Sequence, residues 1–273
     1  MNVVVAPHVA DTLHRLAQSK PHAIVFSGLA GVGLATIAKE TASQWGEIIE
    51  IMSPEAKTKS GIASISVEKI RSLYELSRTK AATSRIVIID DADAMTESAQ
   101  NAVLKLLEEP AANVHFFLTT HAPDGLLPTI RSRAQHIQIP PVDSAATARF
   151  LRSLHVEDDA TKRQLLFVAD GLPAEAYRLA KDPIVLQKKS KIVRQAYEFI
   201  AGTPYEKLVI TQSIASDRAY ALDFIDAALL LLKKSLQSSA KTPAILLADA
   251  LMDAKQKIAA NGSIRLQLAR IVV

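Results

Sequence analysis

The chain has 273 residues, which is long enough for two or three domains, each with its own buried core. Apolar residues make up 49% and charged residues 22%, and the formal charge of +4 permits contact with a polyanion without indicating one. The absence of cysteine excludes disulfide bonds and cysteine-ligated zinc, and fits a reducing compartment. We expect a cytoplasmic protein, because residues 1–16 lack the pattern of a signal peptide and the longest apolar run, residues 227–232, is too short to span a bilayer.

Three continuous apolar runs predict strands that are buried on both faces of a parallel sheet. They are residues 23–27, 86–89 and 114–118. Stretches of helical character follow the first strand and precede and follow the second. They lie at 35–44, 67–79 and 96–109. This alternation of strand and helix predicts the α/β class.

From Pro140-Pro141 onward the pattern is helical. Asp143 and Asp158 are typical helix starts, and Asp182-Pro183 closes a compact helical stretch. We therefore predict an α/β domain followed by two all-helical units. Their ranges are 1–140, 141–182 and 183–273.

The first predicted strand ends on a glycine-rich loop, G-L-A-G-V-G-L-A-T, at residues 28–36. Strand, loop and helix follow one another as in a phosphate-binding P-loop, G-x-x-x-x-G-K-[ST]. Leu34 stands where that pattern has the phosphate-binding lysine, and Ala35 where it has the hydroxyl that ligates Mg²⁺. The loop keeps Gly28, Gly31 and Gly33, so its shape is retained while its usual chemistry is lost. Weak nucleotide binding through backbone amides stays open.

The same glycines also approximate a dinucleotide-binding fingerprint, G-x-G-x-x-G, from Gly31 onward. Thr36 replaces its third glycine, and no acid ends a second strand about 20 residues later in the right context. We rank this interpretation last.

Asp90 and Asp91 end the second predicted strand, which is the Walker B position of nucleotide-hydrolysing enzymes. There the first acid holds Mg²⁺ and the second polarises the attacking water. The second acid is usually glutamate, so Asp91 is one methylene too short. Alternatively, the pair merely ends a strand and caps the next helix.

Three segments, DDADAMTESAQNAVLKLLEEP (90–110), FFLTT (116–120) and LLPTIRSRAQ (126–135), resemble the clamp-loader branch of the AAA+ family. The similarity covers residues 1 to about 180; beyond them there is only a general match to a helical collar. The resemblance implies a P-loop AAA+ domain, a small helical lid and an all-helical collar that oligomerises. The family's zinc-binding cysteines are missing, so we propose no metal site.

Site residues follow from the resemblance position by position. Thr120 matches sensor 1, a polar side chain at a strand end near the γ-phosphate. Arg133, in S-R-A where the family has S-R-C, matches an arginine finger that reaches a neighbouring subunit's ATP. The alternative is an ordinary surface arginine beside Arg131. Ala174 stands at the sensor 2 arginine position, and Arg178, one turn later, is able to compensate.

Lys105 is the only basic residue of the predicted helix at 96–109. In the family the matching helix lines the central chamber, so Lys105 is a weak candidate for contact with DNA. A solvated lysine paired with Glu109 is the favoured alternative.

Four residues depart from the family at positions that would touch ATP, Mg²⁺ or water. They are Leu34, Ala35, Asp91 and Ala174. They favour a stator-like subunit that requires no cofactor and has no ATPase activity of its own. The resemblance implies that such a subunit helps to load a sliding clamp onto primed DNA within a hetero-oligomeric ring. ATP would be bound by partner subunits. The alternative is an active AAA+ ATPase, either the motor subunit of the loader or a related replication-repair ATPase, and an ATP-binding assay distinguishes it from the silent subunit.

Overall fold

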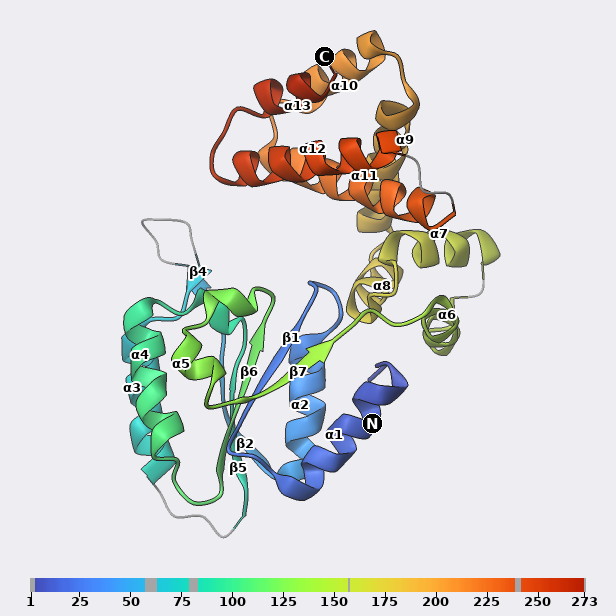
Figure 1. The fold of residues 1–273 in the computed structure, drawn as a ribbon. Coiled ribbons are helices and arrows are strands. Elements are labelled where there is room, and N and C mark those ends of the chain that lie inside the picture. The colour runs from blue at the N-terminus through green and yellow to red at the C-terminus, as the bar shows by residue number, and fades with distance from the viewer. Residues whose placement is uncertain (1–2, 57–62, 79–82, 157, 239–241, 273) are drawn as a thin grey trace. The chain divides into compact units, whose positions relative to one another are not determined.

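The computed structural model describes residues 3–56, 63–78, 83–156, 158–238 and 242–272. The chain divides into two compact units, Met1–Lys181 and Asp182–Val273 (Figure 1). The predicted boundary at residue 140, between sheet domain and lid, falls inside the first unit, so the three-domain division stays a prediction.

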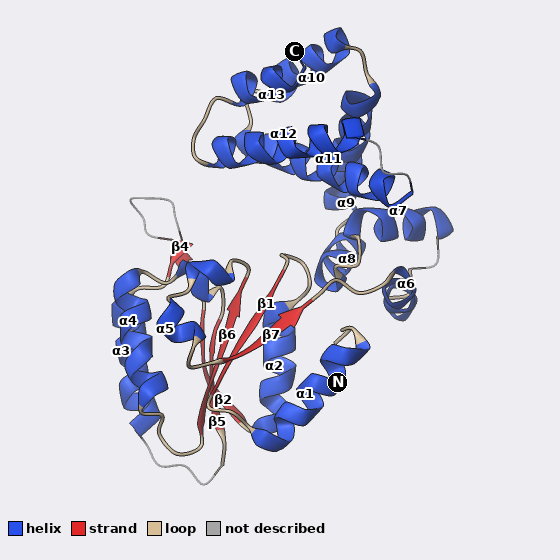
Figure 2. Ribbon diagram, in the orientation of Figure 1, coloured by secondary structure: helices blue, strands red, loops and turns tan. Residues whose placement is uncertain are grey.

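The first unit is built on a five-stranded sheet in which every pair of neighbours is parallel (Figure 2). Its order is β2-β5-β6-β1-β7. The strands are β1 (Ala23–Gly28), β2 (Glu47–Met52), β5 (Arg85–Ile89), β6 (Val114–Thr120) and β7 (Gln135–Ile139). All three predicted strands are confirmed, as is the α/β class. A separate antiparallel ribbon joins β3 (Glu55–Ala56) to β4 (Ala63–Ser64).

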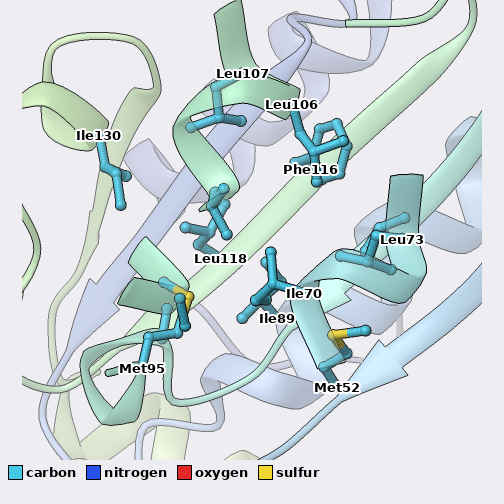
Figure 3. Close-up of a cluster of buried hydrophobic side chains, with 14 of the residues drawn as sticks. Met52, Ile70, Leu73, Ile89, Met95, Leu106, Leu107, Phe116, Leu118 and Ile130 are labelled. Carbon is cyan, nitrogen blue, oxygen red and sulfur yellow. The ribbon is translucent and has the colours of Figure 1, made fainter. Parts of the chain in front are cut away.

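Successive side chains of the central strands enter different cores on the two faces of the sheet, which is why these runs are apolar throughout. One core contains Val87, Phe116 and Leu118 together with residues of α3 (Val67–Arg78) and α4 (Glu97–Glu108) (Figure 3). The other contains Ile86, Ile88 and Phe117 with residues of α1 (Pro7–Ser19) and α2 (Leu34–Trp45). Helices therefore cover both faces (Figure 1).

Three short helices follow β7, in the range of the predicted lid. They are α6 (Ser144–Ser153), α7 (Asp159–Ala169) and α8 (Pro173–Lys181). Asp143 and Asp158 cap the first two by accepting hydrogen bonds from backbone N–H groups, which confirms both predicted starts. Gly171, with φ of 81°, lies against the chain that leaves β7, because a Cβ there would come within 2.3 Å of the Val142 carbonyl oxygen. Only glycine permits this close approach.

The second unit is all-helical. It comprises α9 (Pro183–Ala201), α10 (Pro204–Ile214), α11 (Arg218–Ser238), α12 (Thr242–Ala259) and α13 (Ile264–Val272). One apolar cluster holds these helices together, and within it Phe199 and Phe224 pack edge to face. None of the helices in the described ranges is both long and apolar enough to cross a bilayer.

Candidate functional site

The glycine-rich loop joins β1 directly to α2, as its sequence predicts. Gly31 and Gly33 have φ of 91° and 94°, a left-handed conformation that glycine adopts without strain. Gly33 is the N-cap of α2 and provides no side chain to its free N–H groups. The strand, loop and helix of a P-loop are therefore all present.

Leu34 lies inside the protein. Its side chain is 3% exposed and belongs to the core on the α1 and α2 face, with Val32, Ile37 and Ile139. A Cβ built on Gly28 would lie 3.4 Å from a methyl group of Leu34, so the side chain turns back over the end of β1. The position of the P-loop lysine is thus occupied by an apolar core residue.

The lid contacts the loop through backbone atoms. The N–H groups of Ala174 and Glu175, at the start of α8, donate to the carbonyl oxygen of Gly31 over 2.9 and 3.1 Å. A Cβ on Gly31 would lie 3.0 Å from the Glu175 Cβ, and one on Gly33 would lie 3.4 Å from the Ala174 Cβ. The start of α8 is therefore in van der Waals contact with the loop.

Arg178 is held on the lid itself. Its Nε and Nη2 donate to the two carboxylate oxygens of Glu175, each over 2.9 Å. This bidentate pairing fixes the planar guanidinium along α8. From the sequence, Arg178 is able to compensate for the arginine that is missing at position 174. In the structure, the guanidinium of Arg178 is hydrogen-bonded to Glu175.

Asp90 faces the same side of the sheet as α2 and is bound by a residue that the sequence did not single out. The Thr119 hydroxyl donates to Asp90 Oδ1 over 2.7 Å and accepts from the Asp91 N–H over 3.0 Å. Thr119 is fully buried near the end of β6. It therefore fixes both acids relative to the neighbouring strand.

Thr120, the predicted sensor 1 residue, is also fully buried. Its hydroxyl accepts a local hydrogen bond from the Ala122 N–H over 3.1 Å. Because side chains alternate along a strand, Thr120 faces the α3 and α4 core while Thr119 faces the α2 side. The structure thus brings Thr119, and not Thr120, to Asp90.

His121 connects the loop to Asp91. Its Nδ1 lies 2.8 Å from the carbonyl oxygen of Gly28, and its Nε2 lies 3.6 Å from Asp91 Oδ1. Since a carbonyl only accepts, Nδ1 carries the hydrogen. Sequence reasoning missed both Thr119 and His121; their polar character directly around the end of a buried strand was the available signal.

The pKa of the Asp91 carboxyl is raised above its ordinary value of 3.8, mainly by burial and then by the charge of Asp90. His121 opposes this shift and Asp93 adds to it. Asp91 also adopts the left-handed conformation, with φ of 49°. The folded protein therefore holds the Asp91 proton more tightly than the unfolded chain does, and this contribution to stability is lost as pH rises through the folded pKa.

We expect Asp91→Asn to raise the melting temperature near neutral pH. Asparagine removes the disfavoured charge and tolerates positive φ. Because the Asp91 side chain is 45% exposed, solvent screens the effect, and we expect about 1–2 °C. The gain should shrink as pH falls toward 3.8, where the unfolded aspartate is half protonated. Thermal unfolding over this pH range measures the gain in melting temperature, and Asp11→Asn, at an exposed position of α1, is the control. A gain that does not depend on pH would contradict the raised pKa of Asp91.

Arg133 lies two residues after the end of α5 (Pro128–Arg131). In the sequence it is far from the glycine-rich loop and from Asp90 and Asp91. Its Nη2 is 2.9 Å from Glu108 Oε1 at the end of α4, and its Nη1 donates to the Thr129 carbonyl over 3.2 Å. Its side chain is 38% exposed. Gln100 of α4 binds the segment before α5, through the Gly125 carbonyl and the Leu127 N–H. The arginine is therefore at the surface, on a loop anchored to α4.

Lys105 is exposed on α4. Within the described ranges it forms no ion pair with Glu109, so the predicted pairing is absent there. Ala35 lies partly exposed in the first turn of α2. Among the described residues, no three histidine, aspartate or glutamate side chains are grouped so that they could hold a metal ion.

Residues 46–143 match a family model described as DNA polymerase III, delta subunit. The chain is 30% identical over 185 residues to the DNA polymerase III subunit delta' of Pseudomonas aeruginosa, covering 58% of this chain and 55% of that protein. It is 31% identical over 151 residues to the subunit delta' of Escherichia coli, covering 54% and 45%. The match to replication factor C subunit 3 of Oryza sativa is 24% over 217 residues, covering 74% and 59%. The chain spans about half the length of the curated relatives it matches.

Two solved structures share the fold. A DNA polymerase III gamma subunit-related protein from Thermotoga maritima has a TM-score of 0.58 at 18% identity, over 96% of both chains. The RuvB Holliday junction branch migration motor of the same organism has a TM-score of 0.51 at 15% identity, over 77% of this chain and 82% of the other. The parallel sheet, the glycine-rich loop and the relatives agree, and together they support a relation of this chain to the clamp-loader branch of the AAA+ family.

Proposed function

We propose that this protein is a delta-prime-like, stator subunit of a DNA polymerase III clamp loader, which does not hydrolyse ATP but completes the ATP site of a neighbouring subunit. The observation that carries the first half is the glycine-rich loop, whose lysine position is a buried leucine. The relatives support the assembly, since their names describe them as subunits of DNA polymerase III and of replication factor C.

The residues around the loop do not fit Mg²⁺-ATP. A buried Leu34 offers no charge to the β- and γ-phosphates, and Ala35 offers no oxygen to Mg²⁺. The start of α8 contacts the loop at Gly31 and Gly33, and Ala174 stands there at the position where the family resemblance implies an arginine. Each of these features weakens binding or catalysis by itself, and together they leave no charged side chain at the loop for the transferring phosphoryl group.

Arg133 carries the second half of the proposal. A guanidinium supplied from a neighbouring subunit neutralises charge on the phosphoryl group in the transition state. Arg133 is partly exposed on a loop that Gln100 fixes to α4, so it is accessible to a partner chain. A buried arginine could not act in trans.

The all-helical second unit offers apolar surface to other subunits. Exposed apolar side chains lie on α10, α12 and α13: Tyr205, Leu208, Val209, Ile245, Leu246, Met252 and Leu266. Exposed apolar side chains in such number favour an interface. We propose that this unit is the collar, which joins the chain to the other loader subunits in a hetero-oligomeric ring. The sliding clamp and primed DNA are contacted within the complete complex, where Lys105 is available to a phosphate.

A working AAA+ motor is the competing function. One observation favours it: Asp90 is present and is oriented by Thr119, as a Mg²⁺-binding acid would need to be. The two functions differ in whether the protein alone binds and hydrolyses ATP.

We expect the purified protein to show no Mg²⁺-dependent ATP turnover above background, and to assemble with the motor subunits and clamp-binding subunit of its own loader. The measurements are steady-state phosphate release, and size-exclusion chromatography of the mixture. Turnover near the usual enzyme range of about 1 s⁻¹ would identify a motor. Failure to assemble would refute the loader function altogether.

A further inference from the structure

Arg133 is tied to α4 by an acidic residue to which the family resemblance assigns no role. Glu108 is the last residue of α4, and its Oε1 lies 2.9 Å from Nη2 of Arg133. On the other side of the guanidinium, Nη1 donates to the Thr129 carbonyl over 3.2 Å and to the Ser132 hydroxyl over 3.5 Å. The guanidinium is therefore fixed from two directions.

Stability does not account for the pair. A carboxylate at the C-terminus of a helix is disfavoured by the helix dipole. The two side chains are 38% and 48% exposed, and ion pairs this exposed contribute little to folding. What the contact does is restrict a long side chain that otherwise has many rotamers.

The restricted guanidinium still has donors to offer. Arginine has five N–H donors, and the three contacts use Nη1 and Nη2 only. In the part of the chain that the structure describes, Nε of Arg133 has no hydrogen-bond partner. A phosphate brought by a neighbouring subunit can therefore bind without displacing Glu108.

The loop beneath Arg133 is anchored to the same helix. Gln100, 5% exposed, donates to the Gly125 carbonyl over 3.0 Å and accepts from the Leu127 N–H over 2.7 Å. α4 thus positions the backbone of the loop through Gln100 and the side chain of Arg133 through Glu108. A group that stabilises a transition state does so more effectively when it is already oriented before the reaction.

We propose that Glu108 is a positioning residue for Arg133, holding the guanidinium in the orientation in which it meets the phosphoryl group at the neighbouring subunit's ATP site. This inference rests on the proposed function of Arg133. It assigns to the end of α4 a role in catalysis at another subunit.

The test is a double-mutant cycle in the reconstituted loader. In this complex, every ATP site except the one that faces this chain is inactivated by substitution of its P-loop lysine. The measured ATP turnover then comes from that one site. Glu108→Ala should lower kcat about 10-fold, with the KM for ATP unchanged, because orientation and not binding is lost. Glu108→Gln, which keeps an acceptor oxygen, should retain most of the activity. Glu109→Ala, an exposed neighbour without a described ion pair, should have no effect.

In an Arg133→Ala background, Glu108→Ala should cause no further loss. If the loss persists there, Glu108 acts through something other than Arg133 and the proposal is wrong. If Glu108→Ala, like Glu109→Ala, leaves turnover unchanged while Arg133→Ala lowers it, then Glu108 does not position Arg133, and the proposed function of Arg133 is unaffected. A rise in turnover would also overturn it, since the pair would then restrain the finger. If Arg133→Ala itself has full turnover, the proposed function of Arg133 fails, which is a separate result.

Discussion

Arg133→Ala should lower ATP turnover at the site that faces this chain by about 10³-fold or more, while the protein still folds and assembles. The guanidinium acts on charge that develops in the transition state, so the loss should appear in kcat and not in assembly. Folding should be unaffected because the side chain is partly exposed and its ion pair lies at the surface.

Two further variants show what the site requires of the residue at position 133. Arg133→Lys should recover little, because lysine lacks the planar fork that matches phosphate oxygens. Arg131→Ala removes a positive charge two residues away that is paired with Asp124, and should leave turnover unchanged. Single-turnover phosphate release and clamp loading onto primed DNA are the measurements. Wild-type values for Arg133→Ala would reduce Arg133 to an ordinary surface charge.

Restoring the P-loop residues should fail to create an ATPase. We expect the double variant Leu34→Lys with Ala35→Thr to lose about 1–3 kcal/mol of unfolding free energy, because the leucine that it replaces is 3% exposed. We expect no turnover, since Asp91 remains short, Ala174 supplies no arginine and α8 remains against Gly31.

Urea unfolding and phosphate release measure these two outcomes. Thr36→Lys places the same side chain on the exposed side of the same helical turn, and should change stability by no more than about 0.5 kcal/mol. A stable, hydrolysing double variant would mean that the loop tolerates a lysine in the active orientation. The proposed lack of ATPase activity would then depend on residues 34 and 35 alone.

Much of the fold follows from local sequence pattern. The runs at 23–27, 86–89 and 114–118 are apolar on both faces, and such runs fit only strands covered on both sides. The edge strand β2 is different: it contains Glu47 and Glu50, so its pattern is weaker than that of the three continuous apolar runs. Its pairing with β5 is a long-range contact, which no local pattern records.

The sequence by itself determined the fold class, the relation to clamp loaders and the chemistry missing from the glycine-rich loop. Residue identity is sufficient there, because leucine and alanine cannot replace a lysine and a hydroxyl in any conformation. Only the tertiary structure decided which threonine meets Asp90, where Arg178 and Arg133 are held, and that the lid contacts Gly31. Apart from the local contacts of Arg178 with Glu175 and of Arg133 with Thr129 and Ser132, these contacts join residues about 25 to more than 140 positions apart, and they depend on strand register and helix docking. The chain must fold before they exist.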